Sequence, residues 1–346
     1  MTSAQGTRSK RNWLIYLLLA LACIHCARSI FYVNLSFIDL AKYEQGTEKM
    51  PFQGRVAMIP VLRWAHSNPL AIKTAAFFEW SLKKTPHMQI PPEDYTPEKL
   101  VCMLIGVASV MAMTGAAIWF GQRHLRELWW LPGVLTLAML FTTYSSRYEI
   151  PFWYPYDLPH FALFGVACLL VLEDMLVPAM LLFLVDVPLR ETSIYLVPIV
   201  LAVGYGTGRL KKAVIAGVFM LAAWMPMHLW IAHRYAHNPS DTGVHWSRIF
   251  VLFANPLHWP QLASAFAFMA LPLYFGRRYA KEKQRYFLLG SVPCLLVTAA
   301  FGIWLETRIW DEWIIPAAVI LSTEFVRRFF PQTIPLEGEE QVLIAA

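Results

Sequence analysis

Four arginines, widely separated in an otherwise apolar chain, are the residues best suited to chemistry. They are Arg55, Arg147, Arg190 and Arg308. A planar guanidinium binds phosphate oxygens through two parallel hydrogen bonds, so a site where these side chains met would bind a phosphate or pyrophosphate. If that anion belonged to a lipid, its tail would stay between apolar helices while its head met the arginines. The sequence therefore predicts a lipid-phosphate site.

Carboxylates near these arginines could supply acid–base chemistry. Asp39 lies six positions after Val33, where the first apolar stretch ends, and Glu44 is the next acidic residue. A carboxylate at this position could accept a proton from an acceptor or bind a divalent ion such as Mg²⁺ or Mn²⁺. An aspartate that only caps a surface helix is the alternative reading of Asp39. Three supporting carboxylates lie near the other arginines in the sequence: Asp157, Glu191 and Glu306.

The Arg190–Glu191 pair lies between two strongly apolar stretches. Ionisable residues at membrane depth are candidates for a functional site by default. Asp186 precedes Arg190 by four residues, which is one helical turn, so an internal ion pair between them is the structural alternative. The sequence leaves both interpretations open.

The elements that must position these residues are apolar segments with the length of membrane spans. The chain has 346 residues, of which 57% are hydrophobic and 15% charged, and its mean hydropathy is +0.46. An ordinary soluble domain carries about 25% charged residues, so a soluble globular protein is excluded. The fold class predicted is an all-α, polytopic integral membrane helical bundle. Basic residues lie at the ends of apolar spans and form no patch with interleaved aromatics, which argues against a nucleic-acid partner.

Hydropathy predicts about ten transmembrane segments. They are 12–33, 99–120, 127–144, 158–172, 175–189, 192–204, 213–232, 258–276, 286–304 and 311–326. The spans 175–189 and 192–204 are short, since a helix of that length reaches only about 20 Å against a hydrocarbon core of about 30 Å. These two segments either cross fully or form a re-entrant pair.

Charge in the short loops predicts the orientation. Basic residues concentrate at one end of the spans, near 123–126, 209–212, 277–285 and 327–328, and the positive-inside rule makes that side cytoplasmic. This gives a cytoplasmic N-terminus over 1–11, a single transmembrane domain over 12–330 and a cytoplasmic tail over 331–346. Within the domain, 34–98 forms a non-cytoplasmic loop whose mixed polar and apolar pattern predicts amphipathic helices on the membrane surface.

Four short features resemble the GT-C class of polytopic glycosyltransferases, and among them uncharacterised bacterial membrane proteins of that type. These features are Asp39 after the first span, the segment MPFQGRVAMIPVLRW, the RETS run from Arg190 and the ETR run from Glu306. The resemblance covers about residues 12–326, as architecture and short motifs. It implies a bacterial cytoplasmic (inner) membrane protein, in contact with membrane lipids. Its implied activity is transfer of a sugar from a polyprenyl-phosphate donor to a glycan, lipid or protein acceptor at the non-cytoplasmic face.

The resemblance also implies roles for individual residues. Asp39 matches the acidic residue of the first outer loop, a general base or a ligand of a divalent ion. Class members commonly carry a second acidic residue there, and here the next one is Glu44, five positions on. Arg190 and Arg308 would hold the lipid phosphate that leaves.

Two other classes of function fit the same residues. A transporter or flippase of lipid-linked glycans would bind the headgroup with these arginines and cleave nothing. A non-catalytic membrane subunit would scaffold an envelope-glycan complex, and the charged residues would then serve structure alone.

Overall fold

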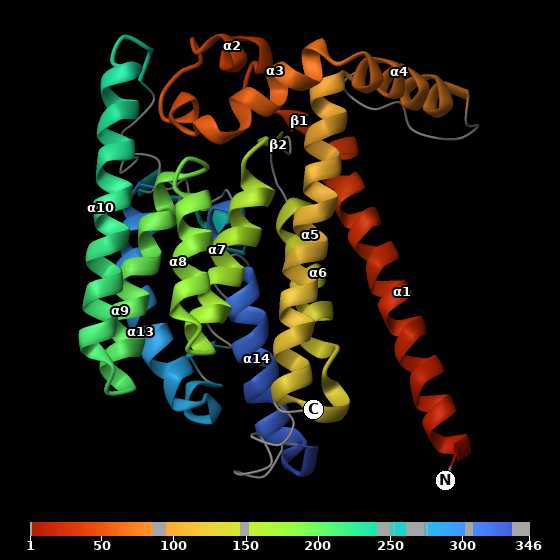
Figure 1. Cartoon of the computed structure of the whole chain (residues 1–346), viewed down its shortest axis with the longest axis vertical. Coiled ribbons are helices and arrows are strands. Elements are labelled where there is room, and N and C mark those ends of the chain that lie inside the picture. The colour runs from red at the N-terminus through yellow and green to blue at the C-terminus, as the bar shows by residue number, and fades with distance from the viewer. Residues whose placement is uncertain are drawn as a thin grey trace.

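The computed structural model describes residues 2–84, 95–145, 152–240, 250–251, 253–260, 273–274, 276–301 and 307–333. Within these ranges the chain folds into a bundle of helices with one short pair of strands (Figure 1). The N-terminus lies at one end of the bundle, and the segment that follows the first helix lies across the other end.

Four of the described helices are long and apolar enough to cross a membrane. They are α1 (Thr2–Val33), α5 (Pro97–His124), α10 (Leu210–Arg234) and α13 (Glu282–Phe301), and the qualifying part of α1 is Asn12–Val33. A span needs about 20 apolar residues. The predicted helical membrane bundle is confirmed at this level, while ten crossings stay a prediction. The predicted span 258–276 lies largely outside the described residues.

Helix α5 shows how the local sequence sets the ends of a span. Thr96 caps its N-terminus, with its side chain accepting a hydrogen bond from the amide of Lys99, and Pro97 occupies the first turn. Arg123 and His124 lie in the last turn, where positive charge complements the helix dipole. No charged residue or proline lies between Lys99 and Arg123, and the helix extends over 28 residues.

Shorter helices complete the bundle. They are α6 (Leu131–Ser145), α7 (Asp157–Leu172), α8 (Leu176–Asp186), α9 (Leu196–Gly206) and α14 (Ile314–Phe329). Helices α8 and α9 have 11 residues each and are joined through the 3₁₀ turn η4 (Glu191–Tyr195). At 1.5 Å per residue each is about 16 Å long, so neither α-helix alone spans a bilayer core.

The segment 35–84, called the cap from here on, covers the end of the bundle opposite the N-terminus (Figure 1). It contains β1 (Leu35–Ser36), α2 (Leu40–Gln45), α3 (Ile59–Ser67) and α4 (Pro69–Lys84), with the 3₁₀ turns η1 (Phe52–Gly54) and η2 (Val56–Met58). Strand β1 pairs in parallel with β2 (Phe152–Trp153), which precedes α7. This pairing holds the start of the cap beside the N-terminus of α7.

Candidate functional site

Five ionisable side chains are buried together beneath the cap. Asp157 and His160 come from α7, Asp186 from α8, Arg190 from the start of η4, and Glu312 from the 3₁₀ segment η7 (Thr307–Trp313). None is more than 7% exposed. This group is called the polar cluster. Isolated buried charges cost several kcal/mol each, so the cluster persists only because its members face one another.

His160 connects two carboxylates through its two ring nitrogens. Its Nδ1 lies 2.7 Å from Oδ1 of Asp186, and its Nε2 lies 3.3 Å from Oε1 of Glu312. The hydroxyl of Thr192 lies 3.2 Å from the same Nε2 and donates to Oε1 of Glu312 at 2.6 Å. An imidazolium donates from both nitrogens, which is the form that suits two acidic partners. The ring therefore joins α7, α8 and η7 through a continuous line of polar contacts.

Arg190 is the cation at the centre of the cluster. Its Nη1 lies 3.6 Å from Oδ1 of Asp157 and 3.4 Å from Oε1 of Glu312, and the guanidinium lies over the ring of Phe161. Within the described part of the chain, Nε and Nη1 of Arg190 have no hydrogen-bond acceptor, and Oε2 of Glu312 has no donor. Buried polar atoms normally have hydrogen-bond partners. A ligand that supplied the missing acceptors and donor would therefore bind with a favourable free energy.

A second arginine reaches the same region from the cap. Arg55 donates to Glu191 from Nε at 3.1 Å and from Nη2 at 2.7 Å, which is a bidentate pair. Arg55 is buried while the Glu191 side chain is 40% exposed, and the guanidinium stacks 4.8 Å from the centre of the Tyr156 ring. Two of the four predicted arginines therefore converge at Arg190–Glu191, but Arg55 already holds a carboxylate.

Three other predicted site residues, two arginines and a supporting carboxylate, are placed only in part. Arg147 and Glu306 lie outside the described residues. Arg308 lies on η7, the element that carries Glu312, and only its backbone is described. Their predicted contribution to a phosphate site stays a prediction.

Asp39 is the N-cap residue of α2. Its carboxylate accepts from the amides of Ala41 at 3.1 Å and Lys42 at 3.2 Å, and it lies 3.6 Å from Nζ of Lys42. The side chain is 49% exposed. These contacts match the helix-capping alternative, and its role as a base stays a prediction. The alternative ion pair between Asp186 and Arg190 is not the one observed, because Asp186 pairs with His160 and Arg190 pairs with Asp157 and Glu312.

A second polar group joins the cap to α5. Potential ligand atoms of Glu44, His66 and Glu98, from α2, α3 and α5, all lie within 4.8 Å of one another. Nδ1 of His66 is 2.7 Å from Oε1 of Glu98, and this bond raises the pKa of His66. Burial, followed by the charge of Glu98, raises the pKa of Glu44. One imidazole and two carboxylates could hold a divalent ion such as Zn²⁺ or Mn²⁺.

An apolar cavity lies beside η7, the element that carries Glu312. It measures about 310 Å³ and lies between α13 and α14, with Phe287, Leu295 and Ile320 among its lining residues. Trp310 and Trp313 of η7 also line it, and Trp313 directly follows Glu312 in the chain. An apolar chain could therefore lie in this cavity, beside the element that also carries Glu312.

Comparison with known proteins identifies no family for this chain. No protein-family model matches the chain, and no curated protein matches it. The polar cluster and the cavity beside η7 are thus the features from which a function can be proposed.

Proposed function

We propose that the chain is a membrane glycosyltransferase that takes a sugar from a polyprenyl-phosphate donor and uses the polar cluster as its active site. The observation that carries this proposal is the buried guanidinium of Arg190, whose Nε and Nη1 have no hydrogen-bond acceptor among the described residues. The Oε2 atom of Glu312, an ion-pair partner of Arg190, likewise has no donor among them. The guanidinium of Arg190, which can bind an anion, and the carboxylate of Glu312, which can accept a proton, are therefore adjacent. Transfer of a sugar from a phosphate to a hydroxyl needs both.

The donor would bind with its phosphate at Arg190 and its polyprenyl chain in the cavity between α13 and α14. A guanidinium attracts phosphate more strongly in a buried site than in water, because the effective dielectric constant is lower. Arg55 would serve mainly to hold Glu191, whose carboxylate already occupies its Nε and Nη2. The cluster lies at the capped end, which the loop charges assign to the non-cytoplasmic face.

In the proposed reaction, an acceptor hydroxyl oxygen bonds to the anomeric carbon of the sugar. The bond from that carbon to the phosphate oxygen breaks, and its electron pair leaves with the polyprenyl phosphate. Arg190 neutralises the charge that develops on this phosphate. Glu312, through Oε2, takes the hydroxyl proton, and Asp39 is the alternative base that the family resemblance implies.

The residues Glu44, His66 and Glu98 are the described group that fits the divalent ion implied by the resemblance. An ion bound there would join α2, α3 and α5 and would hold the cap on the bundle. The proton and phosphate steps above use the residues of the chain alone.

The test compares Arg190→Lys with Arg63→Lys, the same substitution at an exposed arginine of the cap that bonds the backbone of Glu44. Native mass spectrometry would measure binding of polyprenyl phosphate. Arg190→Lys keeps the charge but loses the guanidinium geometry, so we expect binding to weaken by about tenfold, the factor for one charge-assisted hydrogen bond. Arg63→Lys should bind normally, and unchanged binding in Arg190→Lys would contradict the proposal.

Transfer itself would be assayed with polyprenyl-phosphate hexoses and a membrane-extract acceptor, for Glu312→Gln and Asp39→Asn. We expect Glu312→Gln to bind polyprenyl phosphate and to lose transfer. If transfer were lost in Asp39→Asn alone, the base would be Asp39 of the cap. Full transfer in both variants would show that neither carboxylate takes part in the reaction. Thermal unfolding of each variant shows whether the fold is retained.

Transport of a lipid-linked glycan without cleavage is the second candidate. The observation that favours it is the buried line Asp186–His160–Glu312, because chains of carboxylates and histidines carry protons in many transporters. Proteoliposomes with a labelled lipid-linked sugar distinguish the two. A transferase yields a new glycoside, whereas a transporter moves the intact donor across the bilayer and loses that movement in His160→Gln.

A further inference from the structure

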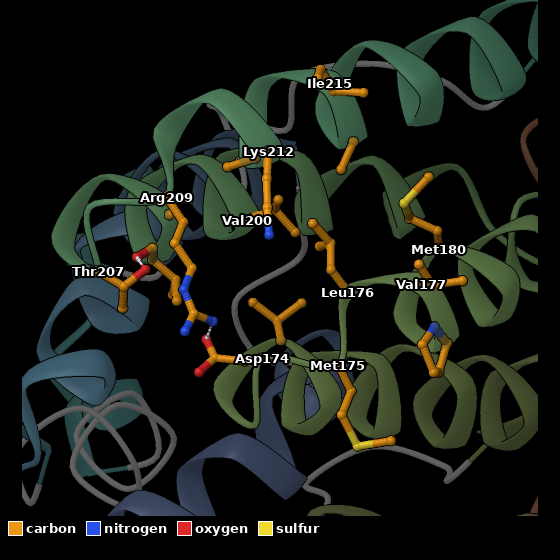
Figure 2. Close-up of a pocket in the computed structure, with 16 residues that line it drawn as sticks. Asp174, Met175, Leu176, Val177, Met180, Val200, Thr207, Arg209, Lys212 and Ile215 are labelled. Carbon is orange, nitrogen blue, oxygen red and sulfur yellow. Dashed lines mark hydrogen bonds and ion pairs between the residues drawn. The ribbon is translucent and has the colours of Figure 1, made fainter.

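A second cavity lies far from the polar cluster and has no part in the proposed transfer. It measures about 570 Å³ and lies between α8, α9 and α10, beside the turn that follows α7 (Figure 2). Asp174 lines this cavity, whereas Asp157 of the polar cluster begins α7. The 16 residues of α7 separate the two by about 24 Å, at 1.5 Å per residue.

One side of this cavity is an apolar wall. Leu176, Val177 and Met180 of α8 and Ile215 of α10 form it. Val177 is 68% exposed and Ile215 is 61% exposed on helices otherwise rich in apolar side chains. Exposed apolar surface of this kind is costly in water and suits contact with acyl chains.

The other side of the cavity is basic. Arg209 lies 3.0 Å from Asp174, through Nη1 and Oδ1, and Lys283 binds the second oxygen of Asp174 at 2.5 Å. Asp174 is therefore shared by two cations. Lys212, in contrast, makes no hydrogen bond or ion pair with the described residues, and Figure 2 shows its side chain directed into the cavity. Two cations thus bind the one carboxylate, and Lys212 adds a third positive charge at the cavity, so the rim carries a net positive charge.

We propose that this cavity binds an anionic phospholipid of the leaflet on the N-terminal side. Its phosphodiester would contact Lys212 and Arg209, and an acyl chain would lie along the apolar wall of α8 and α10. The basic rim and the apolar wall are continuous, which matches a lipid headgroup and its chain. Basic pockets between membrane helices on the cytoplasmic side have the charge that anionic headgroups require.

The experiment uses the full chain in detergent and native mass spectrometry with added phosphatidylglycerol or phosphatidylcholine. Lys212→Ala is compared with Lys211→Ala, which removes the same charge from the neighbouring exposed residue outside the cavity lining. We expect Lys212→Ala to weaken phosphatidylglycerol binding about fivefold, which corresponds to about 1 kcal/mol for one lysine at an anionic surface. Lys211→Ala and Lys212→Arg should bind like the unmodified chain.

Leu176→Trp tests the apolar wall independently, since the larger ring would fill the groove and displace the chain of either lipid. Equal binding of the two lipids, or equal loss in Lys211→Ala and Lys212→Ala, would overturn the proposal. Glycerol phosphate that competed as strongly as phosphatidylglycerol would also overturn it, because the site would then recognise a soluble anion. Polyprenyl phosphate binding at Arg190 should be unchanged in Lys212→Ala, so the two sites are tested separately.

Discussion

Arg190 acts among carboxylates that outnumber the cations. The polar cluster and the adjoining Arg55–Glu191 pair hold four carboxylates against two arginines and one histidine. With all four carboxylates ionised and His160 protonated, these seven residues carry one net negative charge, so their net charge does not attract a phosphate. Binding of a phosphate would depend on direct hydrogen bonds from Nε and Nη1 of Arg190, which makes guanidinium geometry decisive.

His66 makes stability depend on pH. Its hydrogen bond to Glu98, followed by the charges of Glu98 and Glu44, raises its pKa above the ordinary value of 6.5. A cation with a raised pKa in the folded state stabilises the fold fully below 6.5, and this contribution is lost as pH rises through the higher value. We expect the melting temperature in detergent to fall over that range, and to fall less in His66→Ala.

The matched control is His237→Ala, which removes an exposed histidine of the turn after α10. The melting temperature of this variant should fall with pH as steeply as that of the unmodified chain. The same slope in all three proteins would show that the His66–Glu98 bond contributes nothing measurable. Arg63, whose charge lowers the pKa of Glu44, is unchanged in each variant.

At the level of residues, the sequence predicts which side chains are unusual but not what they contact. Arg190 and Glu191 are conspicuous because they interrupt apolar stretches. The bond between Thr192 and Glu312 joins residues 120 positions apart, and that between His66 and Glu98 joins residues 32 positions apart. No spacing rule relates such residues, because helix packing alone brings them together.

Helices α9 and α13 approach each other closely at a glycine. A Cβ atom on Gly290 would lie 2.8 Å from the carbonyl oxygen of Pro198 and 2.9 Å from Cα of Ile199. Both are backbone atoms, which cannot move aside without shifting α9. Gly290→Ala should therefore destabilise the protein by about 1–3 kcal/mol, as overpacking does in tightly packed cores. Thermal unfolding in detergent measures the loss.

Gly115 of α5 provides the comparison, because a Cβ atom there would meet no atom of the described residues within 4 Å. Gly115→Ala should leave the melting temperature unchanged or raise it slightly, since alanine favours a helix over glycine. Equal melting temperatures for the two variants would show that α9 and α13 are not tightly packed at Gly290.

Element boundaries differ from the predicted spans where prolines and turns interrupt apolar runs. The predicted span 175–189 is helical only to Asp186, because Pro188 cannot continue the hydrogen-bond pattern. The predicted span 192–204 begins as the 3₁₀ turn η4, and the α-helix starts at Leu196. The hydropathy pattern predicts the apolar segment but not the position within it at which the helix ends.

The orientation of the whole molecule can be tested with single cysteines. All five native cysteines are buried, so a membrane-impermeant maleimide should label the unmodified protein poorly in intact cells. We expect Ser67→Cys in the cap to be labelled from outside, and Lys211→Cys at the other end to be labelled only after permeabilisation. The reverse pattern would invert the topology and would place the polar cluster at the cytoplasmic face.

The ion pair between Arg55 and Glu191 constrains the order in which the chain can assemble. The two residues are 136 positions apart, so the ribosome releases Arg55 long before its partner exists. Until then, settling the cap into its final place would bury a guanidinium without a counter-ion, which is strongly unfavourable. We therefore expect the cap to close over the bundle only after η4 has reached the same side of the membrane.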